Sequence, residues 1–186
     1  MKKLFAIVGM SGSGKSVVTD YLEQKGFTKI YFGGVVLDKL KENNLEITPE
    51  NEKMMREKLR ADLGMAAMAI TLLPKIKEVS ANNDCVLDGL YSWDEYLVLE
   101  KEFGAKLKMI CVCCDKDIRY DRVSKRVERP LSRDEIIRRD TSEIENLAKG
   151  GPIAYADYYI LNNGTLEDYY KRVDEILEKT DKQEGE

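Results

Sequence analysis

The residues best suited to chemistry stand near the start of the chain, at positions 9–16, which read GMSGSGKS. They match the pattern G-x-x-x-x-G-K-[ST], in which glycines let successive backbone amides turn toward a polyphosphate and the lysine reaches its outer phosphates. The final serine of the pattern holds Mg²⁺. We therefore predict that a nucleoside triphosphate, with ATP expected and GTP left open, contacts the following residues: Gly9, Ser11, Gly12, Ser13, Gly14, Lys15, Ser16 and Val17.

Two further sets of charged residues suit phosphoryl transfer. Asp88 ends an apolar run, where a carboxylate can orient Mg²⁺ beside the loop, although an aspartate there can also cap the next turn. Arginines recur on both sides of Pro130, and two arginine-rich helices around such a break have the form of a lid that closes over phosphates. Besides Lys15, our catalytic candidates are Arg122, Arg126 and Arg139. A solvated helix face is the alternative.

The elements that must position these residues alternate along the chain. Apolar and β-branched runs predict strands at residues 4–8, 27–32, 85–89, 106–114 and 158–161. Helical patterns and caps predict helices at residues 17–23, 35–41, 48–63, 65–79, 93–103, 117–126, 132–147 and 165–177, with the GGP of residues 150–152 ending the seventh. This alternation predicts an α/β fold, a three-layer P-loop NTPase sandwich with a five-stranded parallel sheet and helices on both faces.

Composition narrows the functional classes. A chain of 186 residues suits one domain, which we place at residues 1–179, followed by a polar tail at residues 180–186. The net charge of -4 makes a nucleic-acid partner unlikely. No apolar run approaches the roughly 18 residues of a membrane helix, and no signal peptide is recognisable, so we expect no membrane partner and a cytoplasmic protein. The four cysteines suit buried strand positions in a reducing compartment.

Over nearly its whole length the chain resembles the adenylate-kinase-like P-loop kinases, in particular dephospho-CoA kinase and a related, uncharacterised archaeal group of kinases. The resemblance is carried by residues 9–16, the Asp-Gly pair at 88–89, the R-x-x-R-x-x-x-R pattern of 119–126, and ADYYILNNG at 156–164. In dephospho-CoA kinases a similar final segment lies near the adenine, which assigns Asn163 to the nucleotide. The resemblance also implies a lid over residues 122–139 and an acceptor-binding helical insert over residues 35–79.

The chain departs from these kinases on the acceptor side. Nucleoside monophosphate kinases carry G-D-[LV]-[LV]-R after the second strand, where residues 33–37 read GGVVL, so that Gly34 and Leu37 leave this segment without an aspartate or an arginine. Adenylate kinases carry D-G-x-P-R after the third strand, where residues 88–92 read DGLYS, with Tyr91 and no arginine. Arg56 and Arg60, four residues apart on one helical face, are the candidates to replace this charge. With Asp88 they form the predicted substrate-binding set, although surface charge is the alternative for both arginines.

These observations predict an ATP-dependent small-molecule kinase. It would transfer the γ-phosphate of MgATP to a nucleotide-like acceptor, such as a nucleoside monophosphate or a dephospho-CoA-like compound, without an obligatory protein partner. A P-loop ATPase or a nucleotide-binding regulatory protein without a kinase acceptor is the alternative. Acceptor-dependent ADP formation distinguishes the first from the other two.

Overall fold

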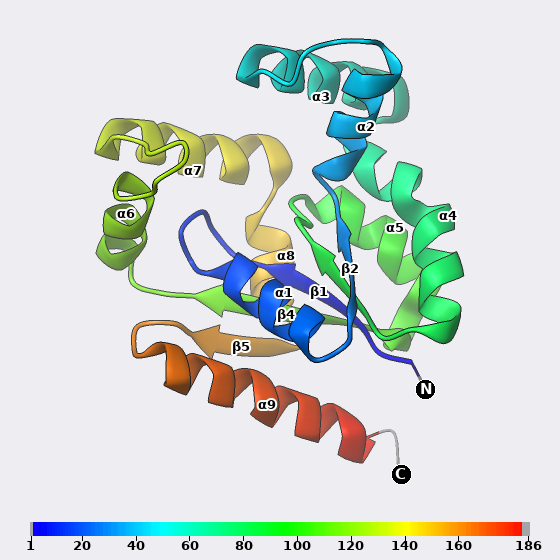
Figure 1. Ribbon diagram of the computed structural model, residues 1–186, viewed down its shortest axis with the longest axis vertical. Coiled ribbons are helices and arrows are strands. Elements are labelled where there is room, and N and C mark those ends of the chain that lie inside the picture. Colours follow the sequence, from blue (N-terminus) through cyan, green and yellow to red (C-terminus); the bar gives the residue numbers. More distant parts are fainter. Residues whose placement is uncertain (1, 184–186) are drawn as a thin grey trace.

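The computed structural model describes residues 2–183. At its centre lies one sheet of five parallel strands in the order β2-β3-β1-β4-β5 (Figure 1). The strands are β1 Leu4–Val8, β2 Thr28–Tyr31, β3 Cys85–Asp88, β4 Leu107–Cys113 and β5 Tyr158–Leu161. The predicted five-stranded parallel sheet is confirmed, and each strand lies within two residues of its predicted bounds.

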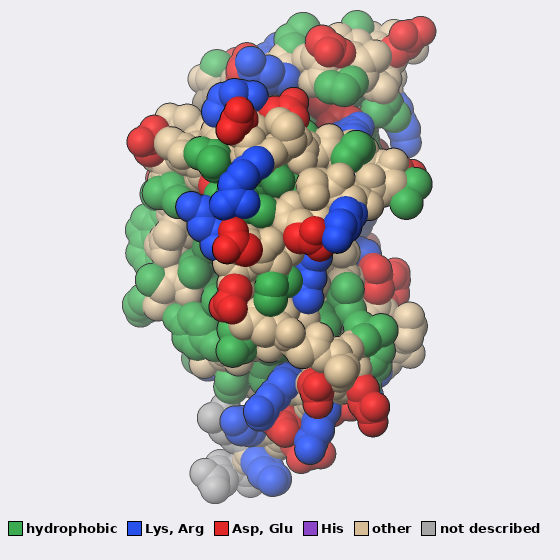
Figure 2. Space-filling model, turned by 90° about the vertical axis from the view of Figure 1, so that its left-hand side faces the viewer, with side chains coloured by type: hydrophobic (Ala, Val, Ile, Leu, Met, Phe, Trp, Pro, Cys, Tyr) green, Lys and Arg blue, Asp and Glu red, His purple; other side chains and the backbone are tan. Residues whose placement is uncertain are grey.

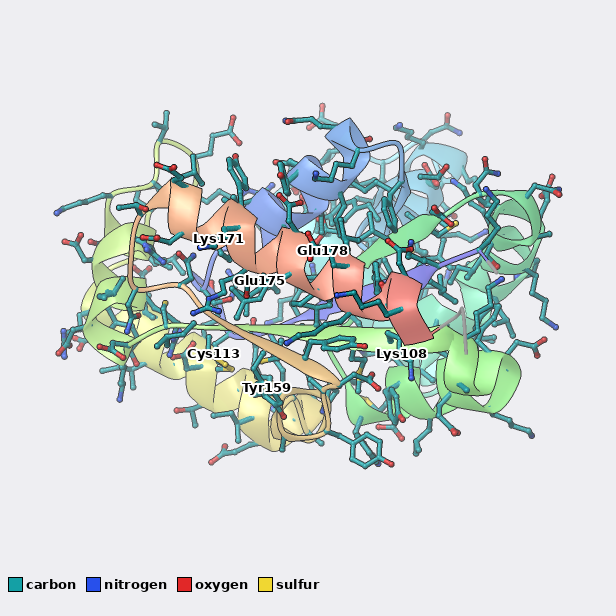
Figure 3. The ribbon with its side chains drawn as sticks, turned by 90° about the horizontal axis from the view of Figure 1, so that it is seen from below. Lys108, Cys113, Tyr159, Lys171, Glu175 and Glu178 are labelled. Atoms are coloured by element: carbon teal, nitrogen blue, oxygen red, sulfur yellow. The ribbon has the colours of Figure 1, made fainter. Side chains whose placement is uncertain are left out.

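Helices cover both faces of this sheet. In chain order they are α1 Lys15–Gln24, α2 Gly34–Glu42, α3 Pro49–Leu63, α4 Ala67–Asn82, α5 Trp93–Phe103, α6 Lys116–Ser124, α7 Arg133–Leu147, α8 Gly150–Ala154 and α9 Leu166–Gln183, with a 3-10 turn at Gly104–Lys106. Helices α1 and α9 pack on one face, and Figure 3 shows α9 lying across β4 and β5. Helices α2, α4, α5 and α8 pack on the other face. This three-layer arrangement confirms the predicted fold class.

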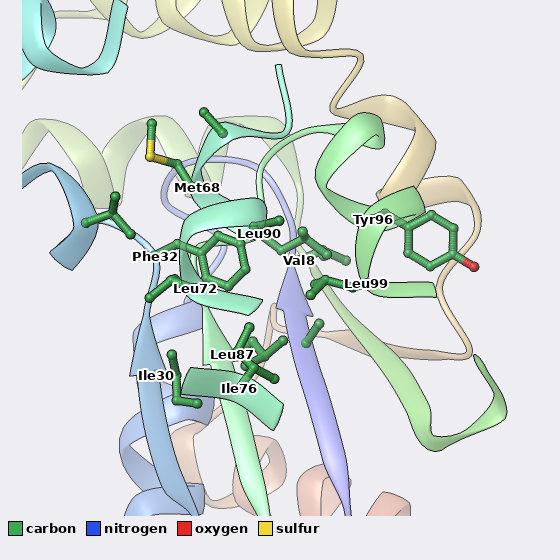
Figure 4. Close-up of a cluster of buried hydrophobic side chains, with 14 of the residues drawn as sticks. Val8, Ile30, Phe32, Met68, Leu72, Ile76, Leu87, Leu90, Tyr96 and Leu99 are labelled. Carbon is green, nitrogen blue, oxygen red and sulfur yellow. The ribbon is translucent and has the colours of Figure 1, made fainter. Parts of the chain in front are cut away.

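The two cores follow from the alternation of side chains along β1. Leu4, Ala6 and Val8 point into the core shared with α4 and α5, part of which appears in Figure 4. Phe5 and Ile7 point into the core shared with α1 and α9. All five side chains are at most 1% exposed, and full burial of such a side chain contributes about 1.5–3 kcal/mol. The strand is therefore buried on both sides, as its unbroken apolar sequence predicts.

Several helix starts depend on local capping. Thr48 accepts a hydrogen bond from the amide of Asn51 and Pro49 occupies the first turn of α3, as predicted. Ser132 forms a capping box with Glu135 at the start of α7, also at the predicted position. These side chains satisfy amides that have no partner within the helix.

Three helices, α4, α6 and α9, end elsewhere than predicted, and the GGP segment does not end α7. Helix α4 continues to Asn82, three residues beyond its predicted end. Helix α6 ends at Ser124, two residues short of the predicted end. Helix α7 ends at Leu147 because Ala148 adopts a left-handed conformation with φ 47, and the glycines of the GGP segment begin α8. Gly151 serves close packing there, since a Cβ would lie 2.7 Å from the ring of Trp93. Helix α9 continues through the start of the predicted tail to Gln183, and residues 184–186 lie outside the described part of the chain.

Helices α3, α6 and α7 lie beyond the carboxyl ends of the strands (Figure 1), the edge where open parallel sheets bind ligands. Arg129, in the loop between α6 and α7, forms a two-pronged ion pair with Glu52 of α3, with N–O distances of 2.9 and 3.3 Å. This contact joins two segments that are 77 residues apart in the chain. Basic and acidic side chains are interspersed over the face that carries α6 and the start of α7 (Figure 2). None of the helices within residues 2–183 is both long and apolar enough to cross a membrane.

Candidate active site

The predicted phosphate loop lies between β1 and α1. Gly12 and Gly14 have φ values of 82 and 104, a region that side chains disfavour. A Cβ on Gly12 would also lie 2.7 Å from the backbone oxygen of Arg119, so that helix α6 can approach the loop only because this residue is glycine. The glycines of the motif are therefore required both by the backbone of the loop and by its neighbours.

Donors from other elements hold the carbonyl groups of the loop outward. Arg119 Nη1 contacts Ser11 O at 2.8 Å, Asn162 Nδ2 contacts Ser13 O at 2.8 Å, and Tyr169 Oη contacts Gly14 O at 2.9 Å. Because a trans peptide directs its N–H away from its C=O, the amide that follows each of these carbonyls points to the opposite, inner side of the loop. Ser13 Oγ is buried without a hydrogen-bond partner among the described residues, close to Gly9, on which a Cβ would lie 2.8 Å from this oxygen. Inward amides suit an anion.

Lys15 begins α1 and is half-buried. Its ammonium group donates to the carbonyl of Met10 at 3.0 Å. Burial, followed by repulsion from Lys149, lowers the pKa of Lys15 to about 7. The ammonium is therefore poorly solvated and lies close to another positive charge, a setting that a phosphate would relieve. The next residues of the predicted set, Ser16 and Val17, follow in the first turn of α1, and Ser16 is exposed.

Asp88 ends β3 beside the loop, as predicted. Its carboxylate lies 3.9 Å from the ammonium of Lys29, and burial raises its pKa while the charges of Lys29 and Lys15 lower it. Within residues 2–183, His, Cys, Asp and Glu side chains form no group of three or more that could hold a metal ion by themselves. The oxygens of Asp88 and Ser16 fit Mg²⁺, which usually keeps several waters and takes phosphate oxygens as ligands.

The structure separates the predicted catalytic arginines. Arg139 lies beside the loop site, with Nε 3.0 Å from Glu143 Oε1. Arg122 lies on α6 with Nη1 3.7 Å from Cys114 Sγ. Arg126 is exposed and lies in the coil after α6, so the helix predicted over residues 117–126 does not reach it. Because the helix ends at Ser124, Arg122 and Arg126 do not share a helical face although they are four residues apart.

Arg119 has a role that the sequence analysis did not assign. Its guanidinium forms a buried ion pair with Asp140 of α7, with Nη2 2.6 Å from Oδ2, in addition to its bond to the loop. Arg119 and Asp140 are 8% and 7% exposed. One arginine thus connects the phosphate loop with both arginine-rich helices. The repeated arginines of residues 119–126 suggest a contact with the phosphates, but their spacing does not show which arginine is buried.

Asn162 and Asn163 both make contacts around the loop, other than the nucleotide contact that was predicted for Asn163. The side chain of Asn162 is buried and supports the loop at Ser13. The side chain of Asn163 accepts a hydrogen bond from the amide of Asp115, at the start of α6. Both asparagines therefore position elements around the loop, and contact of Asn163 with a nucleotide stays a prediction.

A second cluster of charges in front of the loop was missed by the sequence analysis. Lys149 is 1% exposed, and its ammonium lies 2.5 Å from Glu143 Oε2 and 4.4 Å from the ring centroid of Tyr91. Glu143 is also the partner of Arg139. Burial, above all, raises the pKa of Tyr91 to about 12, so this ring stays neutral under the lysine. The only local signal was a lysine beside the GGP segment.

The opposite side of the site is formed by α3 and the turn after β3. The carboxylate of Glu95 accepts hydrogen bonds from the amides of Tyr91 and Ser92 in that turn. The charge of Glu95 also acts on the half-buried guanidinium of Arg60, whose pKa is lowered by burial. Arg60 Nε is buried without a hydrogen-bond partner among the described residues. Arg56, on the same helix, is more exposed and lies 4.0 Å from Glu52.

An aromatic ring packs against the glycine pair that follows β2. A Cβ on Gly33 would lie 2.3 Å from the ring carbon Cζ and from the hydroxyl of Tyr31. The ring of Tyr31 therefore packs against Gly33, next to the position at which nucleoside monophosphate kinases carry an aspartate. Gly34 begins α2, and Leu37 lies in its first turns. This segment differs from that of the nucleoside monophosphate kinases in its packing as well as in its charge.

Comparisons with known proteins find relatives by sequence and similar solved structures. A family model described as an AAA domain matches residues 6–146. A UPF0200 protein of Thermococcus onnurineus is 32% identical over 180 residues, which are 95% of this chain and 97% of that protein. Shikimate kinase from Bacteroides thetaiotaomicron has a TM-score of 0.62 at 14% identity, covering 95% of this chain and 98% of that one. Dephospho-CoA kinase from Campylobacter jejuni has a TM-score of 0.56 at 15% identity, with coverages of 96% and 97%.

At these identities the likeness to the two kinases concerns the fold. The predicted membership of the P-loop kinase fold is confirmed. The narrower resemblance to dephospho-CoA kinases or nucleoside monophosphate kinases stays a prediction.

Proposed function

We propose that this chain, which belongs to the UPF0200 protein family, is a kinase that transfers the γ-phosphate of ATP to a small anionic acceptor. Its residues 6–146 form an AAA domain. The observation that carries this proposal is the position of Arg60. Its Nε is buried and has no hydrogen-bond partner within residues 2–183. It belongs to a helix that packs beyond the carboxyl edge of the sheet, where the phosphate loop also lies. An ATPase needs the loop alone, whereas a kinase also needs a cationic site for a second substrate.

The donor half of the reaction depends on the loop. Its inward amides and Lys15 would bind the β and γ phosphates, and phosphoryl transfer requires mainly such positioning and positive charge. Ser16 and Asp88 would hold Mg²⁺, which when bound neutralises charge on the phosphate oxygens. Arg139 would contact the phosphoryl group in transfer. The charge of Arg122 lowers the pKa of Tyr169, whereas burial raises it. Since Tyr169 bonds to the loop, this position of Arg122 suits contact with the nucleotide.

The acceptor half depends on the surrounding helices. We propose that residues 35–79 are the acceptor-binding insert and residues 122–139 the lid of a single domain. The ion pair between Arg129 and Glu52 supports this arrangement, because it joins the loop between α6 and α7 to α3 across the carboxyl edge of the sheet. Closure of the two segments would exclude water from the transfer. The acceptor in this proposal is a nucleotide-like small molecule, and no protein partner is required.

The Arg60→Ala variant is expected to raise the KM for the acceptor, or lower kcat/KM, by roughly 10- to 100-fold, because a charge-assisted hydrogen bond contributes about 1.5–3 kcal/mol. The Kd for ATP should change by less than about twofold, since Arg60 belongs to the acceptor side in this proposal. The acceptor is first identified by screening a metabolite library for ADP release by the purified protein, and steady-state kinetics then compare the variants.

Lys58→Ala is the matched control for that experiment, because Lys58 is an exposed cation on the same helix. It should leave both substrates unaffected. Equal effects of Arg60→Ala on ATP and acceptor, or no effect on either, would return Arg60 to a surface or packing role. Acceptor-independent hydrolysis throughout the library would favour the ATPase alternative.

The affinity for ATP is expected to fall as the pH rises above about 7, by up to roughly tenfold per pH unit. The sign follows from Lys15: its pKa of about 7 means that it is charged, and able to attract phosphate, only below that pH in the free protein. Calorimetric Kd values between pH 6 and 9 measure this. Lys15→Arg should flatten the profile, because arginine stays charged over the whole range. A flat profile in the unaltered chain would contradict this role of Lys15.

A further inference from the structure

The charges in front of the phosphate loop do not balance. The cations there are Lys15, Arg139 and Lys149, with Lys29 at 3.9 Å from Asp88, and the carboxylates are Glu143 and Asp88. Glu143 is shared, because it contacts Arg139 at 3.0 Å and Lys149 at 2.5 Å. Burying charge is costly unless each ion has its own compensation. The excess of positive charge in this space indicates that an anion belongs there.

Lys149 is the least explained member of this group. It is fully buried, although an ordinary lysine keeps its ammonium in water. An ammonium group has three N–H donors. Glu143 takes one of them, and the face of the Tyr91 ring lies under the group at 4.4 Å. Capacity for a further anionic acceptor therefore remains on this ammonium.

The repulsion between Lys149 and Lys15 indicates where that acceptor would lie. After burial, the charge of Lys149 is the largest influence on the pKa of Lys15 and lowers it. Two ammonium groups that repel each other at a phosphate loop are both stabilised when an anion lies between them. The segment that carries Lys149 leads into α8, where Gly151 packs closely against Trp93, and this packing fixes the backbone beside the lysine.

We propose that Lys149 is a second phosphate-binding lysine, which contacts the terminal phosphate of the bound nucleoside triphosphate together with Lys15. Glu143 acts as the positioning residue that holds Lys149 in the site. This inference rests on the proposed function only in that the loop binds a nucleoside triphosphate; it does not depend on the identity of the acceptor. It implies that the chain distinguishes triphosphate from diphosphate before any transfer takes place.

The test compares the Kd of the β,γ-imido analogue of ATP with the Kd of ADP, measured by calorimetry with Mg²⁺ and no acceptor. Lys149→Met is expected to weaken binding of the triphosphate analogue roughly 10- to 100-fold, the loss of one charge-assisted hydrogen bond, and to leave ADP within about twofold. Lys149→Arg, which keeps the charge, should retain most of the preference for triphosphate. Lys106→Met is the matched control, because Lys106 is a part-buried lysine bonded to Ser80 O at 2.7 Å at the amino end of β4.

Each outcome decides the inference. An equal loss for both nucleotides would make Lys149 a support of the loop and overturn the proposal, and so would an unchanged pair of Kd values. If Lys149→Met does not fold, the double variant Lys149→Met/Glu143→Gln removes both charges of the pair and is measured in the same way. Failure of the unaltered chain to bind either nucleotide would overturn the proposed function itself. A triphosphate preference that depends on Lys149, without transfer to any acceptor, would leave this inference standing and contradict the kinase.

Discussion

Lys15→Ala is expected to lower kcat by at least about 100-fold. The ammonium of Lys15 bonds to Met10 O within the loop, and in the proposed reaction it turns to the phosphates. Removal of one preorganised charge contact of this kind costs about 3–4 kcal/mol in comparable oxyanion sites. The measurement is acceptor-dependent ADP formation at saturating ATP, with Lys15→Arg as the variant that keeps the charge.

The thermal midpoint serves as the control for this prediction. The pKa of Lys15 is lowered in the folded chain, so folding disfavours its charged form, and below the unfolded pKa the charge destabilises the native state. Lys15→Ala should therefore leave the midpoint unchanged or raise it. Activity within a factor of ten of the unaltered chain would show that the loop is not catalytic.

Asp88→Asn is expected to lower kcat/KM by roughly 100-fold, because correct placement of Mg²⁺ is worth several kcal/mol in phosphoryl transfer. The amide keeps the shape of the side chain but not the charge that orients the metal's waters. Activity of the unaltered chain should require Mg²⁺ or Mn²⁺. Asp94→Asn, at an exposed position in the first turn of α5, is the matched control and should behave as the unaltered chain does.

The pH profile separates a role in metal binding from a role in the turn. Burial raises the pKa of Asp88, so its carboxylate is ionised above that raised pKa and becomes neutral as the pH falls through it. As the pH is lowered, activity should begin to fall at a higher pH than it would if this group were an exposed aspartate. That acid limb should be absent in Asp88→Asn. Unchanged rates in the variant would make Asp88 a cap of the turn after β3.

The phosphate loop and the fold class could be predicted from sequence because their signals are local. The chain that runs from Leu4 to Ser16 contains a buried strand, the glycines and the helix start within one short stretch, and each requires only its neighbours. Likewise, alternation of strands and helices is sufficient to predict parallel pairing. Caps such as Thr48 and Ser132 act within four residues, and both helix starts were predicted correctly.

The errors concern positions where local signals compete. The basic pattern of α6 continues to Arg126, but the backbone leaves the helix after Ser124, so equal spacing in the sequence did not produce a common face. The GGP segment has the composition of a helix end, yet Gly151 is needed for contact with Trp93 across the fold. Small residues serve turns and close packing alike, and the sequence alone does not distinguish the two uses.

The sequence by itself determined the position of the loop predicted to bind phosphate, whereas the tertiary structure decided what surrounds it. Arg119, Asn162 and Tyr169 support the loop across separations of 108 to 155 residues. The charge of Lys149 acts on Lys15 although 134 positions separate them in the chain. Charges and donors carry no periodicity that reveals a distant partner. Only the packing of α6, α8 and α9 around the carboxyl edge of the sheet decides which of the many charged residues meet at the phosphate site.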